Sequence, residues 1–71
     1  MTIIETLQAE LDNAAPYNKS GDKIASTTEG GHVYTAIAER CIATRSSRTW
    51  FRVRYQMDGN RISKDALSAV E

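Results

Sequence analysis

The sequence predicts a small α+β domain in which two helices cover one face of an antiparallel meander sheet. Both ends of the chain have the capping residues and apolar spacing of amphipathic helices. Residues 48–57 alternate with period two, which is typical of a strand with two distinct faces. Asp58-Gly59 is a strong signal for a two-residue hairpin turn. The predicted order is therefore α-β-β-β-α within a single domain, residues 1–71.

The first helix is expected over about residues 2–15. Thr2 and Glu5 have the spacing of a capping box, in which each side chain accepts a hydrogen bond from the other's backbone. Pro16 ends the helix, because the residue before a proline is pushed out of the helical region. One apolar stripe, expected to face the core, is formed by residues at helical spacing: Ile4, Leu7, Leu11 and Ala14.

Residues 16–31 are rich in proline, asparagine, serine and glycine, which predicts a loop. A short extra edge strand at about residues 23–27 is the alternative, and Gly30-Gly31 would then turn it into the next strand. The glycine pair lacks the further glycines or lysine of a phosphate-binding loop.

Residues 33–44 have mixed propensities, since Ala36, Ala38, Glu39 and Arg40 favour a helix and the β-branched residues around them favour a strand. If residues 45–48 form the turn of a hairpin, the numbers of facing residues sum to 93. This register places Ile42 opposite Phe51 and Glu39 opposite Arg54, a favourable cross-strand pair, with Arg40 opposite Val53 as its one poor fit. The sequence thus favours a strand over about residues 33–44, paired with a strand over 49–57.

The Asp58-Gly59 turn leads into a third strand at about residues 60–62, which brings Ile62 opposite Tyr55. Ser63 then caps a short helix over about residues 63–70, with Asp65 in its first turn. Phe51, Val53 and Tyr55 are expected to be buried beneath the two helices.

The other face of the sheet carries the candidate binding residues. Tryptophan among arginines is typical of protein-interface hot spots and equally of platforms that stack single-stranded nucleic acid. A third interpretation is structural: the tryptophan packs against the aliphatic parts of arginine side chains at one edge of the sheet. The predicted partner-binding residues are Arg48, Trp50, Arg52, Arg54 and Arg61.

The net charge and its distribution help to distinguish a protein partner from nucleic acid. The net charge is zero, but residues 1–31 carry two lysines against five carboxylates, whereas residues 32–71 carry seven cations against four. Dedicated nucleic-acid binders usually carry a basic excess, because phosphate contacts supply much of their affinity. The balance favours a protein partner with an acidic surface, and nucleic acid is the alternative.

Catalytic, metal and cofactor sites are not expected. His32 and Cys41 are the only candidates for a thiol–imidazole pair, and nine positions along one strand place them on opposite faces. The single cysteine allows no internal disulfide, and no cluster of metal ligands occurs. Stability must then come from packing or from self-association as a homodimer. With no apolar run of membrane-spanning length and no signal pattern, a cytoplasmic location without membrane contact is expected.

The predicted element order resembles that of the double-stranded-RNA-binding domain. That family binds through its helices and a basic cluster at the start of the last helix. The corresponding segment is Ser63-Lys64-Asp65-Ala66, with its lysine offset by an aspartate, and the family's binding mode is not expected here. The sequence favours a non-enzymatic interaction module, such as an accessory or inhibitory protein of the phage or mobile-element type.

Overall fold

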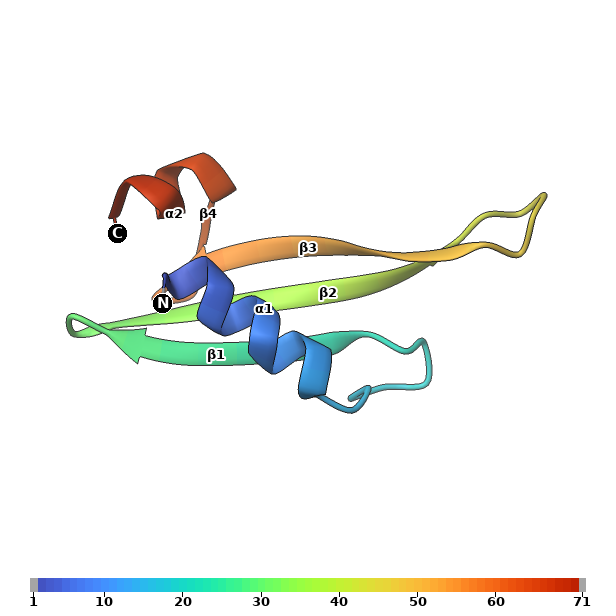
Figure 1. Cartoon of the computed structure of the whole chain (residues 1–71), viewed down its shortest axis with the longest axis horizontal. Helices are drawn as coiled ribbons and strands as arrows, with labels where there is room; N and C mark the ends of the chain where they lie inside the picture. The colour runs from blue at the N-terminus through green and yellow to red at the C-terminus, as the bar shows by residue number, and fades with distance from the viewer. Residues whose placement is uncertain (1, 71) are drawn as a thin grey trace.

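The computed structural model describes residues 2–70, which form two helices and a four-stranded antiparallel sheet (Figure 1). The sheet order is β1-β2-β3-β4, so each strand pairs with its neighbours in sequence. The predicted α+β class and meander topology are confirmed. The elements are α1 Ile3–Asn13, β1 Lys23–Glu29, β2 His32–Ile42, β3 Thr49–Met57, β4 Asn60–Ile62 and α2 Lys64–Val70.

Helix α1 begins with the predicted capping box. The Thr2 hydroxyl accepts a hydrogen bond from the Glu5 backbone N–H (3.1 Å), and Glu5 Oε1 accepts one from the Thr2 N–H (3.4 Å). The helix ends at Asn13 rather than near residue 15, because Ala14 already has extended backbone angles (φ −80°, ψ 144°). The helix therefore ends before Ala15, the residue that Pro16 keeps out of the helical region.

Strand β1 confirms the alternative of an extra edge strand and corrects the loop predicted over this part of residues 16–31. It runs from Lys23 to Glu29 and pairs with β2 along all seven residues. Gly30 and Gly31 form the turn, both with positive φ (56° and 83°), a conformation that glycine adopts without steric penalty. This strand was hard to predict because its serine and threonine residues give no strong apolar alternation.

The β2–β3 hairpin has a different register from the predicted one. Facing residue numbers sum to 91 instead of 93, so that Arg40 lies opposite Phe51 and Ala38 opposite Val53. The loop is longer, over residues 43–48, with an Ala43 N–H to Arg48 O hydrogen bond (2.9 Å) and a positive φ at Ser47 (55°). Because the shift is two residues, every side chain stays on its predicted face.

The C-terminal elements agree with the sequence prediction. Asp58 and Gly59 both have positive φ (51° and 84°), as a type I′ turn requires, and Tyr55 pairs with Ile62. The Ser63 hydroxyl accepts a hydrogen bond from the Ala66 N–H at the start of α2 (3.1 Å). The Asp58 carboxylate also contacts β2, accepting from the Val33 N–H (3.0 Å) and contacting His32 Nδ1 (2.6 Å).

The core lies between the helices and one face of the sheet. Alanines on β1 and β2 sit beneath the helices, and their small side chains let α1 approach the sheet closely. The buried residues are Ile3, Leu7, Leu11, Ala25, Tyr34, Ala36, Ala38, Tyr55 and Leu67, with Ile4, Val53, Met57 and Ile62 packed against them.

Phe51 corrects the predicted core, since 46% of its surface is exposed. The distal part of the β2–β3 hairpin, residues 40–51, projects beyond α1 and is called the hairpin arm below (Figure 1). Its length gives the molecule an elongated shape, with extents of 42 × 22 × 22 Å. Phe51 is on the predicted face and borders a small hollow that Leu11 and Asp12 of α1 also line, but the helix covers it only in part. The ammonium group of Lys23 lies 5.4 Å from its ring centroid.

Candidate interaction face

The sheet face opposite the helices is called the open face, because neither helix covers it. Strand alternation and the burial of the other face identify its members. Four of the five residues predicted to bind a partner, Trp50, Arg52, Arg54 and Arg61, belong to this side, and the fifth, Arg48, directly precedes β3. The face consists of Ile24, Ser26, Thr28, Val33, Thr35, Ile37, Glu39, Cys41, Trp50, Arg52, Arg54, Gln56 and Arg61, flanked by Arg48.

Trp50 lies on the hairpin arm opposite Cys41, and 46% of its surface is exposed. It is the only aromatic side chain of the open face, because Tyr34, Phe51 and Tyr55 alternate onto the helix side. An exposed tryptophan on a regular strand offers a large, rigid apolar surface at low entropic cost.

The arginines form a row rather than a compact cluster. Alternate residues of a strand are about 7 Å apart, so Arg48, Trp50, Arg52 and Arg54 follow one another along β3 at that interval. Arg61 on β4 faces Gln56 and continues the row beside its end. The structure therefore brings four of the predicted residues onto one face, with Arg48 in the loop before β3, and their charges are spread along its length.

Glu39 is the carboxylate of the open face. The register places it opposite Arg52, but its ion pair is diagonal, with 2.8 Å between Arg54 Nε and Glu39 Oε1. The sequence predicted this pair as directly opposite residues, so the partner is correct and the register is not. Both side chains are well exposed, at 50% and 39%, and such pairs contribute under about 1 kcal/mol.

Asp22 borders the open face at the start of β1. The hydrogen bond from the Asn18 side chain lowers the pKa of its carboxyl below the ordinary range, and the Arg40 N–H and the charge of Arg54 act in the same direction. Asp22 is thus ionised and occupied with turn hydrogen bonds. With Glu39 and Asp22 set against four arginines, the open face and its border carry a net positive charge.

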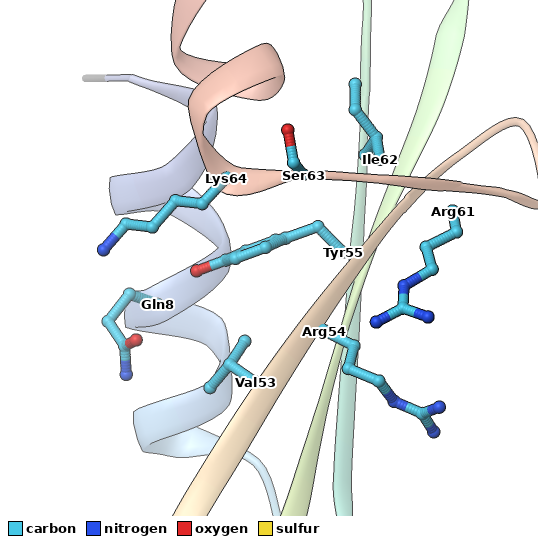
Figure 2. A pocket seen from close by; sticks show the side chains of 8 residues that line it. All are labelled: Gln8, Val53, Arg54, Tyr55, Arg61, Ile62, Ser63 and Lys64. Carbon is cyan, nitrogen blue, oxygen red and sulfur yellow. The ribbon is translucent and has the colours of Figure 1, made fainter.

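A hollow of about 590 Å³ lies at the edge of β3 where β4 ends. Figure 2 shows the guanidinium groups of Arg54 and Arg61 on one side of β3, with Tyr55 and Lys64 on the other. Burial raises the pKa of the Tyr55 hydroxyl, which therefore stays protonated at neutral pH. The lining contains neither carboxylate nor imidazole: Gln8, Val53, Arg54, Tyr55, Arg61, Ile62, Ser63 and Lys64.

His32 and Cys41 lie on opposite faces of β2, as their spacing predicts. His32 contacts the Asp58 carboxylate, whereas the Cys41 thiol donates a weak hydrogen bond to the Glu39 carbonyl at 3.7 Å. No group of three histidine, cysteine, aspartate or glutamate residues within residues 2–70 is placed to hold a metal ion.

The sequence did not identify two members of the open face. Ile24 and Val33 are 47% and 46% exposed, which is high for large aliphatic side chains on a regular sheet. Ile24 lies in the segment that the sequence predicts as a loop or, alternatively, as a short edge strand, and Val33 lies in a predicted strand but not in the predicted site. Once β1 is recognised as a strand, its alternation places Ile24 beside Ile37, so the missing signal was the pairing of β1.

Within the described part of the chain, neither helix has the length and apolar character needed to cross a membrane. Comparison with known proteins found no family model, no curated protein and no solved structure that matches this chain. The candidate site is therefore interpreted from its own chemistry.

Proposed function

We propose that this protein is a non-enzymatic interaction module whose open face binds an acidic surface of a partner protein. The observation that carries the proposal is an uncovered sheet face on which exposed Ile24, Val33 and Trp50 accompany a row of arginines. Protein interfaces combine aromatic and aliphatic anchors with arginine in this way.

Charge complementarity supports an acidic partner. Arg48, Arg52 and Arg61 have no intrachain carboxylate partner among the described ion pairs, so their guanidinium groups are available to carboxylates of another molecule. Guanidinium binds carboxylate in a planar, bidentate geometry. Glu39 and Asp22 would fix the register of the partner by repelling its acidic groups from the β1–β2 side.

Single-stranded nucleic acid is the alternative partner. The regular row of arginines would follow a phosphate backbone, but stacking platforms present successive aromatic rings and this face has only Trp50. The zero net charge also removes the general attraction to polyanions that nucleic-acid binders use. Both observations favour a protein.

The test uses a charge reversal of the row. Arg52→Glu with Arg54→Glu should leave the fold nearly intact, because the lost pair with Glu39 and the new repulsion from that carboxylate both lie on an exposed surface, where such contributions are small. The partner is to be identified by native mass measurement of the chain purified from its own host and then prepared separately. We expect the double variant to weaken that complex at least about a hundredfold, because repulsion replaces attraction at two positions.

A matched control reverses two cations outside the open face. Lys19→Glu with Lys64→Glu changes the net charge by the same amount and should retain parental affinity. Trp50→Ala should weaken binding without a charge change.

The alternative, nucleic-acid binding, is tested with a short single-stranded DNA oligonucleotide. Its binding to the parent protein is measured by fluorescence anisotropy at increasing salt. Steep salt-dependent DNA binding that the Arg52/Arg54 reversal abolishes would replace the protein partner by nucleic acid, and unchanged partner affinity in that variant would refute the proposal.

A further inference from the structure

The outer edge of β1 makes no backbone pairing with another described strand, because β1 is the first strand of the sheet order. The two-residue Gly30-Gly31 turn closes on the facing pair Glu29 and His32, which is therefore a hydrogen-bonded pair. Alternation then directs the backbone N–H and C=O of the even-numbered residues outward: Ile24, Ser26 and Thr28.

This edge lacks the features that protect natural edge strands. It contains no proline, and its seven-residue ladder with β2 is continuous and free of bulges. Its charges stand only at its two ends, Lys23 at one and Glu29 at the other. A regular strand with unpaired backbone groups is a template for another strand.

The opposite edge of the sheet is partly covered by a short strand and carries charges within its strand. β4 covers β3 from Tyr55 to Met57, and the remaining part of β3 carries Arg52 and Arg54. A second copy paired there in antiparallel register would bring arginines together, which is unfavourable. Self-pairing is thus favoured at β1 and disfavoured at β3.

We propose that two copies of this chain pair through β1 in antiparallel register, with Ser26 opposite the partner's Ser26. This register aligns all seven residues and brings Lys23 opposite the partner's Glu29, twice by symmetry. Outward backbone groups then meet outward groups, because even-numbered residues face even-numbered ones. If one β1 strand shifts by one residue along the other, outward backbone groups no longer face outward groups. A shift of two residues restores that match but removes both ion pairs and leaves five aligned residues.

The pairing requires one side chain to move. In the single chain Lys23 lies over the Phe51 ring, 5.4 Å from its centroid, and turns toward the neighbouring strands rather than the free edge. A cation–π contact at a partly exposed site is weak, and the flexible lysine stem can reach the edge instead. The zero net charge means that two copies do not repel each other overall.

The two-fold axis of this pair is perpendicular to the sheet. Both copies therefore present their open faces on the same side, as one eight-stranded sheet, and their helices on the other. The inference does not depend on the proposed function, since it uses the edge of β1 and not the arginine row. A single strand pair is a small interface, so the dimer is expected to dissociate on dilution.

The backbone part of the proposal is tested with Ser26→Pro and its control Ser26→Ala. Proline removes the outward N–H while leaving the ladder with β2, and proline is tolerated at such edge positions. Sedimentation velocity over a concentration series should show a monomer–dimer equilibrium for the parent and for Ser26→Ala. Ser26→Pro should be monomeric at every concentration, with an unchanged far-ultraviolet circular dichroism spectrum.

The register is tested by charge reversal and rescue. Lys23→Glu and Glu29→Lys should each weaken the dimer about tenfold, because two attractive cross-strand pairs become repulsive. The double variant restores opposite charges and should regain parental dimerisation. Arg52→Glu with Arg54→Glu should have no effect, which separates this inference from the function proposed for the open face.

Three results would overturn the inference. The first is a parent chain that stays monomeric at the highest concentrations reached. The second is a dimer in which Lys23→Glu and Glu29→Lys are individually neutral. The third is a double variant that does not recover dimerisation. If Ser26→Pro fails to fold, the charge-reversal set decides the question alone.

Discussion

Glycine and aspartate at the β3–β4 turn show how single residues determine the local path of the chain. Both central positions, Asp58 and Gly59, have positive φ, which L-residues with a branched β-carbon adopt only under strain. Around Gly59 there is open space where a β-carbon would stand. A substitution here therefore changes the backbone energy without creating a steric clash with other side chains.

Gly59→Val is expected to lower the free energy of unfolding by about 1–2 kcal/mol. Gly59→Asn is the control, because asparagine tolerates the left-handed region and should be nearly neutral. Denaturant melts followed by circular dichroism measure both changes. A neutral valine variant would show that the turn is not of this type.

Leu7 and Phe51 are both large and apolar, but only Leu7 is buried. Leu7, on α1, is fully buried against the sheet, whereas Phe51 is 46% exposed on the hairpin arm. Leu7→Ala should cost about 2–5 kcal/mol, enough to threaten so small a domain. Phe51→Ala should cost under about 1 kcal/mol, because about half of its surface is already in water. Comparable losses in denaturant melts would mean that the arm is packed against another part of the protein.

At the scale of elements, one carboxylate connects two turns. Asp58 lies in the β3–β4 turn and contacts both the His32 ring and the Val33 N–H at the start of β2. The hydrogen bond with His32 lowers the pKa of the Asp58 carboxyl, with the Val33 N–H and the charge of His32 acting in the same direction. Asp22 is held by its own turn in the same way.

These lowered pKa values predict loss of stability in acid. In the unfolded chain an aspartate protonates near pH 4, whereas the folded carboxylates protonate only at lower pH. As pH falls below about 4, the unfolded state takes up protons first, and the free energy of unfolding decreases until the folded groups are also protonated. Asp58→Asn should have a flatter acid limb in denaturant melts, with Glu10→Gln as the control for losing one negative charge. An acid limb of parental steepness in Asp58→Asn would contradict this role.

The elements also differ in how far local signals predicted them. The two helices and the β3–β4 hairpin were predictable because Thr2, Asp58-Gly59 and Ser63 act on neighbours within four residues. The β2–β3 register was not, because the hairpin loop over residues 43–48 contains no glycine or proline to mark its turn. β1 was only an alternative to a loop, because its serine and threonine residues give no strong apolar alternation. The open face was predicted correctly in spite of this, since a two-residue shift preserves alternation.

At the scale of the whole molecule, stability depends on one thin layer of core. Nine buried side chains lie between the helices and the sheet, and the hairpin arm adds length without burial. Small domains of this kind usually gain stability from metals, disulfides or association. The proposed pairing through β1 would supply association.

Folding is expected to need neither metal nor disulfide. The chain has one cysteine, and no metal-holding cluster occurs among residues 2–70. Thermal unfolding should therefore have the same midpoint with and without a chelator, and with and without a reductant. The melts should be recorded at one protein concentration, because a dimer makes the midpoint concentration-dependent. A fall of many degrees with either additive would contradict this expectation.

The sequence by itself determined the helix caps, the β3–β4 turn and the face to which each residue of β2 and β3 belongs. These features depend on interactions within a few residues or on the alternation of a strand, which any register shift of two preserves. The tertiary structure alone decided between loop and strand for residues 23–29, made Glu39 reach Arg54 diagonally and left Phe51 only partly covered by α1. Those outcomes depend on where distant segments meet and on how far a helix extends over the sheet. Full burial of Phe51 required more cover than α1 provides before it ends at Asn13, and no local signal around Phe51 contains that information.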